Sequence, residues 1–76
     1  PSEIGINPAN KNIYILEGQN PKLLILSPQG KSQKLYVMKE KQFAQAEGLT
    51  FGENNELYIS NESNGAPANI MKVSLN

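Results

Sequence analysis

The sequence predicts an all-β protein built from seven short strands in two successive repeats. Three apolar elements recur in the same order at a period of about 45 residues. Each element is short and rich in β-branched or aromatic residues, which favours strands over helices. The matching pairs are residues 4–6 with 49–51, residues 13–15 with 57–59, and residues 23–26 with 70–73.

Turn-forming residues separate the predicted strands. In residues 27–30, Ser-Pro-Gln-Gly, Pro holds the second position and Gly the fourth, as in a type I turn. Residues 34–38 then predict a fourth strand that completes the first repeat, whereas the second repeat has three strands. Residues 39–47 are rich in Lys, Glu, Gln and Ala, and Gly48 is placed like a helix C-cap, so a helical turn is an alternative for this connection.

The repeat length identifies the kind of β architecture that we expect. A period near 45 residues with four strands in each period is typical of β-propeller blades. Residues 13–16 and 23–26 are continuous apolar runs, which predict strands that are covered on both faces, as in blades packed face to face. We therefore predict one blade in residues 1–44 and the next in residues 45–76. The alternative is a small independent β-domain of seven strands, whose apolar faces would lack cover.

Two neighbouring motifs point to a family. The last five residues of the segment 43–51 have the pattern acidic-Gly-aliphatic-x-aromatic, at the start of a predicted strand. Residues 57–62, in the next predicted strand, have the pattern aliphatic-Tyr-Ile-Ser-x-Glu. This pair resembles the SdiA-regulated family of bacterial β-propellers, relatives of the NHL-repeat and esterase-like phytase propellers. Residues 1–6 and 13–16 resemble the preceding blade, so the resemblance covers essentially the whole chain. It implies a larger propeller, commonly of six blades, in the bacterial cell envelope or periplasm.

The predicted topology gathers polar side chains at one end of each blade. Because neighbouring strands are antiparallel, the start of the first strand and the end of the second lie together. Glu47 should therefore lie near Asn61 and Glu62, and Ser2 near Glu17. We consider these five residues candidate ligand-binding residues, with Glu47 and Glu62 as candidate metal ligands. Their hard oxygen atoms suit Ca²⁺ or Mg²⁺, with neighbouring blades completing the shell.

Two features of this site remain open at the level of sequence. The acidic side chains have an alternative structural role, in which they cap strand ends by accepting hydrogen bonds from backbone amides. The first repeat also departs from the motif, because Ser2 and Glu3 stand where the second repeat has Glu47 and Gly48. Elsewhere, Tyr14 and Tyr58 occupy matching positions, which favours packing between blades over stacking on a ligand.

Composition narrows the classes of function. The net charge is zero and the Lys residues are scattered, so the basic stripe of a nucleic-acid-binding protein is not present. The longest apolar run, residues 23–26, is far too short to cross a bilayer. The chain has neither Cys nor His, so it lacks the usual ligands of zinc and a His general base.

These observations predict a non-catalytic module that binds a metal, a small ligand or a protein. The alternative is part of a Ca²⁺-dependent hydrolase propeller of the lactonase or phytase-like type. Two blades leave sheet faces and strand edges uncovered. The expected partners are therefore the remaining blades of the same propeller or other copies of this chain.

Overall fold

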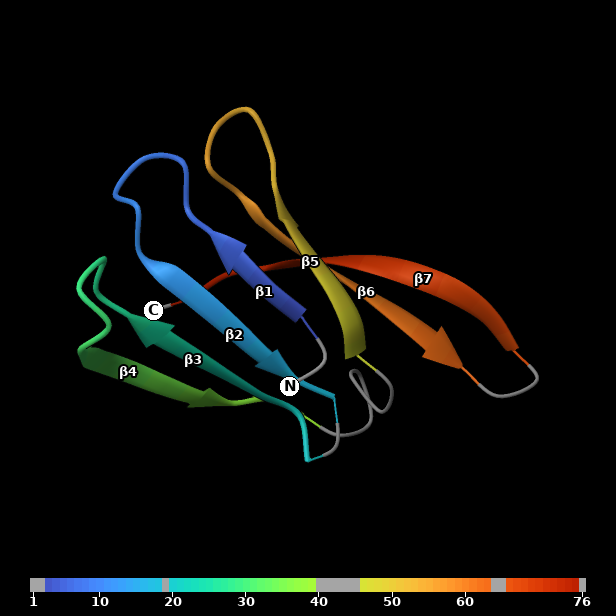
Figure 1. Cartoon of the computed structure of the whole chain (residues 1–76). Helices are drawn as coiled ribbons and strands as arrows, with labels where there is room; N and C mark the ends of the chain where they lie inside the picture. Colours follow the sequence, from blue (N-terminus) through green and yellow to red (C-terminus); the bar gives the residue numbers. More distant parts are fainter. Residues whose placement is uncertain (1–2, 19, 40–45, 64–65, 76) are drawn as a thin grey trace.

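The computed structural model describes residues 3–18, 20–39, 46–63 and 66–75, and every regular element in these ranges is a β-strand (Figure 1). In the described part of the chain the all-β prediction and the predicted seven strands are both confirmed. Within these ranges the chain contains no helix with the length and apolar character that a membrane crossing requires. The strands are β1 (Glu3–Ile6), β2 (Ile13–Glu17), β3 (Lys22–Leu26), β4 (Ser32–Val37), β5 (Ala46–Phe51), β6 (Leu57–Ser63) and β7 (Ala66–Val73).

The strands form two antiparallel sheets, one of four strands and one of three. Their orders are β1-β2-β3-β4 and β5-β6-β7, so each strand pairs with its neighbours along the chain. Tight turns make this possible. In the predicted turn between β3 and β4, the Gly30 amide donates a hydrogen bond of 2.8 Å to the Ser27 carbonyl oxygen. Gly30 has a φ of 85°, a left-handed conformation that favours glycine over residues with a side chain.

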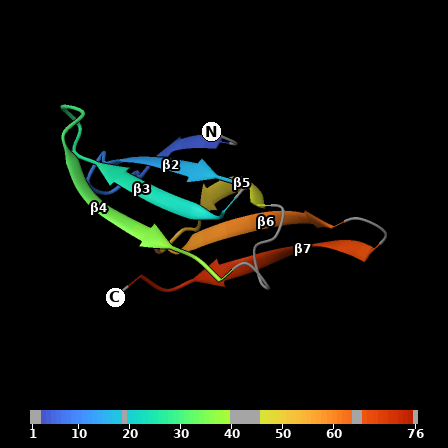
Figure 2. The ribbon, with the colours of Figure 1, turned by 90° about the horizontal axis from the view of Figure 1, so that it is seen from below.

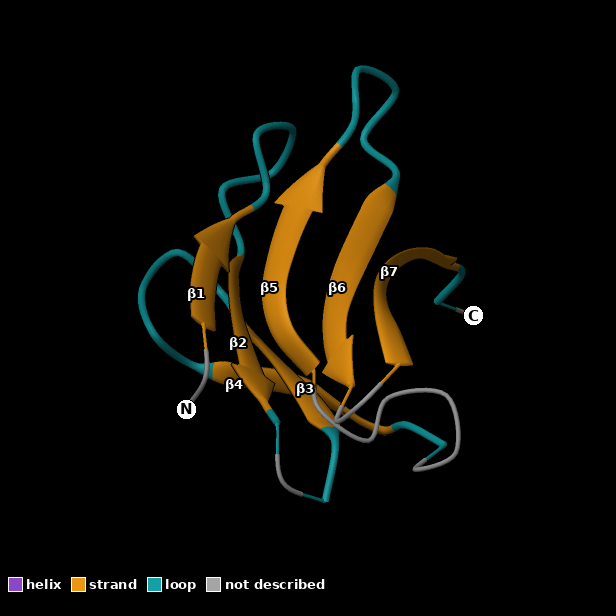
Figure 3. Ribbon diagram, turned by 90° about the vertical axis from the view of Figure 1, so that its right-hand side faces the viewer, coloured by secondary structure: helices purple, strands orange, loops and turns teal. Residues whose placement is uncertain are grey.

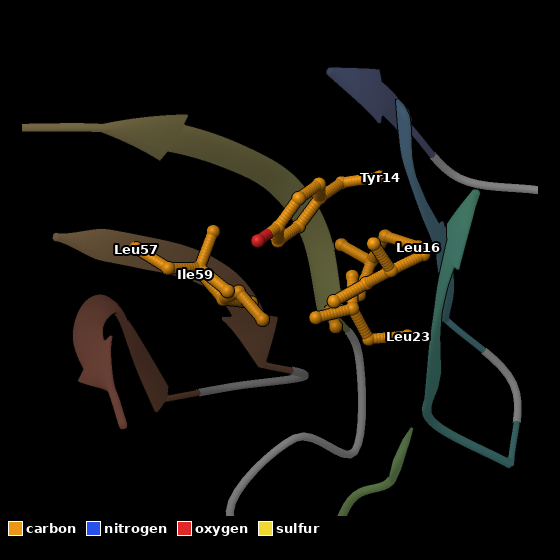
Figure 4. Packing of buried hydrophobic residues seen from close by; sticks show 7 residues of the cluster. Tyr14, Leu16, Leu23, Leu57 and Ile59 are labelled. Carbon is orange, nitrogen blue, oxygen red and sulfur yellow. The ribbon is translucent and has the colours of Figure 1, made fainter. Parts of the chain in front are cut away.

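The two sheets pack face to face, with β5 lying across β1 and β2 (Figures 2 and 3). Side chains from both sheets meet between them, where Leu16, Leu23 and Ile59 are fully buried (Figure 4). The Tyr14 ring also meets the Phe51 ring edge to face, with centroids 5.0 Å apart. The hydrophobic core therefore lies between the repeats, and the position of Tyr14 supports the prediction that this residue packs between the two sheets.

One glycine sets the distance between the sheets. A Cβ atom at Gly5, in β1, would overlap the Cδ1 atom of Leu49 in β5 and would lie 3.7 Å from Phe51 Cε2. The absence of a side chain at this position lets β5 approach β1 closely. Gly5 is thus a packing requirement of the contact between the repeats.

Within the described part of the chain, the continuous apolar runs of β2 and β3 are covered on one face and not on the other. In β2, Tyr14 and Leu16 are buried in the core, whereas Ile13 and Ile15 are half-buried and belong to the opposite face. β3 shows the same alternation between its buried and half-buried residues. The expectation that these strands are buried on both faces is therefore met on the inner face and not on the outer face.

The described end of the connection between the sheets, residues 46–48, departs from the helical alternative. Residues 40–45 lie outside the described ranges, as does the predicted boundary between residues 44 and 45. Ala46, Glu47 and Gly48 lie in β5, so a helix C-cap at Gly48 is wrong. The reason is tertiary packing: Ala46 is only 1% exposed and lies opposite Asn61 of β6, and this burial outweighs the helical preference of the composition.

Candidate functional site

The carboxyl groups of Glu47 and Glu62 meet at one end of the three-stranded sheet. Glu47 lies near the start of β5 and Glu62 near the end of β6, and these strand ends are neighbours because the strands are antiparallel. The hydrogen bond between the two side chains, together with the repulsion between their charges, raises the pKa of Glu47. The predicted proximity of Glu47 and Glu62 is thus present in the structure.

Two irregularities in the strand register accompany this pair. The pairing of β5 with β6 shifts between Ala46 and Gly48, and the pairing of β6 with β7 shifts between Asn61 and Ser63. Glu47 and Glu62 are therefore the residues at which the regular register is interrupted. An interruption of this kind redirects side chains relative to the regular pleat. It explains why two acidic residues on neighbouring strands come into hydrogen-bonding contact.

Asn61 contributes a buried amide next to the acidic pair in sequence. Its side chain is 5% exposed, and its Nδ2 atom donates a hydrogen bond of 3.0 Å to Asn69 Oδ1. Its Oδ1 atom is buried and has no hydrogen-bond partner among the described residues. A buried acceptor without a partner costs free energy, so this oxygen is suited to accept a hydrogen bond. Because Asn61 lies opposite the buried Ala46, its side chain is on the core face and not on the exposed face that carries Glu62.

The other two candidate residues belong to the first repeat. Glu17 ends β2, and its Cα atom lies opposite that of Lys22 in β3. Ser2 lies outside the described residues, so its predicted proximity to Glu17 stays a prediction. The neighbouring Glu3 lies opposite Leu16, which confirms that the start of β1 and the end of β2 share one end of the sheet.

The described residues supply only part of the ligands that a cation requires. Within the described ranges, no group of three or more His, Cys, Asp or Glu side chains is close enough to hold a metal ion. Glu47 and Glu62 provide carboxylate oxygens, whereas Ca²⁺ takes six to eight oxygen ligands. The predicted third ligand, Asn61, lies opposite Ala46 on the core face and does not face the exposed pair. The residue types fit a hard cation, but most of the coordination shell would have to come from water or from another sheet.

A second polar group, which the sequence analysis did not single out, lies at the opposite end of the repeats. Asn7 is 3% exposed; its Oδ1 atom accepts a 2.9 Å hydrogen bond from the Ala9 amide, and its Nδ2 atom donates to the Tyr14 hydroxyl at 3.4 Å. Asn7 also borders a hollow of about 350 Å³ whose lining includes Glu56 and Lys72. The Asn-Pro-Ala-Asn sequence could have indicated this turn, because an Asn side chain commonly accepts a hydrogen bond from the backbone amide two residues later in the chain.

Glu56 shows the structural role that was the alternative for the acidic residues. Its Oε1 atom accepts a 2.8 Å hydrogen bond from the Asn54 amide in the turn between β5 and β6. Hydrogen bonds from its own amide and that of Asn54 lower the pKa of Glu56. Glu56 therefore stabilises a turn as a carboxylate, whereas Glu47 meets a second acidic group and favours the protonated form.

Comparison of the chain with protein-family models, with curated proteins and with solved structures found no match. The resemblance to the SdiA-regulated propellers therefore stays a prediction, and the site rests on its geometry.

The acidic pair makes a testable prediction about pH. The unfolded carboxyl group of Glu47 titrates near 4.5, and the folded pKa is higher. Between these two pKa values the folded chain binds more protons, so its stability falls as pH rises through this window. Replacing Glu62→Gln removes the charge repulsion, and we expect the pKa of Glu47 to move towards its ordinary value.

The measurement is an NMR titration of the side-chain carboxyl carbons, repeated for Glu62→Gln and for the control Glu53→Gln. Glu53 is exposed in the turn between β5 and β6. A Glu47 titration that is the same in all three proteins would show that the two carboxyl groups do not interact in solution.

Proposed function

We propose that this chain forms two successive blades of a bacterial envelope β-propeller of the SdiA-regulated type, and that it is a non-catalytic binding module. The arrangement of its sheets supports the propeller. Two consecutive antiparallel sheets pack face to face, and the first strand of one sheet contacts the first strand of the next, β1 with β5. In a propeller, the first strands of successive blades adjoin each other in the same way around the central channel.

The observation that carries the binding role is the contact between the Glu47 and Glu62 carboxyl groups. Two carboxylates in contact repel each other, and a cation bound between them would relieve that repulsion. The Asn61 side chain does not join this pair, because Asn61 lies opposite the buried Ala46 on the core face of the sheet, whereas Glu62 is exposed. We propose that this end of the blade binds a divalent cation such as Ca²⁺, with the remaining ligands supplied by water or by neighbouring blades.

Calcium titration of the full chain tests this proposal. We expect saturable changes in the amide signals of residues 46–48 and 61–62 at neutral pH, with weak affinity because this chain supplies few of the ligands. Binding should weaken at acidic pH, where protons compete for the carboxylates. Glu62→Gln should abolish the changes, and the control Glu53→Gln should leave them unchanged. Changes that persist in Glu62→Gln, or no changes in the unmodified chain, would contradict the proposed site.

A further inference from the structure

The outer side of the four-stranded sheet is a continuous aliphatic surface. Residues opposite one another in neighbouring strands project from the same face of a sheet. The registers of β1, β2 and β3 thereby place six aliphatic residues together on the face that points away from the core. We call this set the outer aliphatic face, and it consists of Ile4, Ile6, Ile13, Ile15, Leu24 and Leu26.

This surface continues onto β4 and is exposed to solvent. Leu35 lies opposite Leu24, and Val37 lies opposite Lys22 on the same face. Ile4 and Leu35 are each 56% exposed, and Val37 is 77% exposed. Contiguous apolar patches of this kind on a folded chain mark sites of association.

The internal repeat identifies what kind of surface covers this face. Each residue of the outer aliphatic face has a counterpart in the second repeat. The counterparts are Leu49, Phe51, Leu57, Ile59, Met71 and Val73. The registers of β5, β6 and β7 place these residues on one face, and that face packs in the core. The surface that the second repeat buries is thus the same surface that the first repeat exposes.

The structure also shows what such a face packs against. In the core it meets the inner face of the first sheet, which carries Tyr14, Leu16, Leu23 and Ile25. The positions that match Tyr14 and Leu23 in the second repeat are Tyr58 and Ile70, on the outer side of the three-stranded sheet. Ile70 is 72% exposed and, with Tyr58, lines a shallow hollow of about 230 Å³. Each of the two surfaces that meet in the core therefore has a counterpart on the outside of the chain. One counterpart is the outer aliphatic face of the four-stranded sheet, and the other is the outer side of the three-stranded sheet.

We propose that the outer aliphatic face binds a second copy of this chain, head to tail, at the outer side of that copy's three-stranded sheet around Tyr58 and Ile70. In this arrangement the second copy takes the place of a neighbouring blade of the proposed propeller, and the inference does not depend on cation binding. The two surfaces differ, so the contact is heterologous, and repetition produces a chain of copies or a closed ring instead of a symmetric dimer.

The contact between copies is weaker than the contact within the chain. Ser60 and Lys72 stand where the first sheet has Leu16 and Ile25, so the receiving surface is more polar than its internal counterpart. Thr50 also stands where the first sheet has Gly5, whose missing side chain permits close approach. We therefore expect an assembly that dissociates on dilution, not a permanent oligomer.

Sedimentation velocity on the full chain and on two complementary variants tests the head-to-tail contact. The unmodified chain should increase in mass with concentration. Ile4→Lys/Leu35→Lys introduces charges at exposed positions of the outer aliphatic face and of its continuation in β4, and leaves the receiving surface intact. Ile70→Lys charges the receiving surface and leaves the outer aliphatic face intact. Each variant alone should stay monomeric, and an equimolar mixture should form one-to-one dimers through the remaining pair of unmodified surfaces.

Gln29→Lys, in the exposed turn between β3 and β4, adds a charge away from both surfaces and should assemble like the unmodified chain. Circular dichroism checks that each variant keeps its β structure. Three results would overturn the proposal: an unmodified chain that is monomeric at all concentrations, a mixture of variants that stays monomeric, or assembly that Ile70→Lys leaves unaffected. The last result would indicate symmetric pairing of two outer aliphatic faces.

Discussion

Replacing Leu16→Ala is expected to remove a large share of the free energy of unfolding of this chain. Leu16 is fully buried between the two sheets. Truncating a buried Leu to Ala costs about 2–5 kcal/mol, because it removes apolar contacts and leaves a cavity. Globular proteins are stable by about 0.05–0.15 kcal/mol per residue, so a chain of this length has on the order of 4–11 kcal/mol in total. A single truncation in the core thus takes up a large share of that stability.

Leu35→Ala is the matched control, because it deletes the same atoms from an exposed position in β4, next to the outer aliphatic face. In dilute solution, where copies do not associate, we expect it to change the stability by less than about 0.5 kcal/mol. Urea unfolding followed by circular dichroism measures both variants. Equal losses of stability for Leu16→Ala and Leu35→Ala would contradict the position of the core between the sheets.

Gly5→Val is expected to push the two sheets apart and to destabilise the chain by about 1–3 kcal/mol. A Cβ atom at this position overlaps Leu49 Cδ1, and the branched side chain would also crowd Phe51. Val favours strands more than Gly does, so local propensity alone predicts the opposite sign. A loss of stability therefore reports on the contact between β1 and β5 and not on β1 by itself.

A double-mutant cycle with Leu49→Ala isolates this contact. Leu49→Ala removes the atoms that the new side chain would overlap, so it should cost less in the Gly5→Val background than alone, with a coupling of about 0.5–3 kcal/mol. Thr50→Val is the control: it places the same Val side chain at the matching position of the second repeat, on the outer side of β5, and should be close to neutral. Strict additivity of Gly5→Val and Leu49→Ala would show that the sheets do not approach each other here.

Much of the fold is predictable from the sequence, because the signals are local. The repeat places the strands, and the Ser-Pro-Gln-Gly turn is present with its hydrogen bond between Gly30 and Ser27. The beginning of β5 is the exception. Its Ala, Glu and Gly residues have no strand preference, and Ala46 lies in a strand because it is buried opposite Asn61. Burial depends on the packing of two distant segments, which local composition does not contain.

The candidate site is likewise predictable from the sequence in part, and the rest of it depends on the three-dimensional structure. Antiparallel pairing is enough to predict that Glu47 lies near Glu62, because hairpins bring the ends of neighbouring strands together. The two register irregularities beside these residues are not predictable from periodicity, since each depends on one extra residue in a strand. The unpartnered oxygen of Asn61 also requires three-dimensional knowledge, because it depends on how the amide is buried and on its bond to Asn69.

The neighbour-to-neighbour order of the strands has a consequence for how the chain folds. Every pairing in both sheets joins strands that are consecutive along the chain. Each hairpin closes only a short loop, so the entropy lost on closing it is small. Contacts between distant segments arise where β5 meets β1 and β2. Each sheet should therefore form early and independently, and the docking of the second sheet on the first should be the step that limits the folding rate.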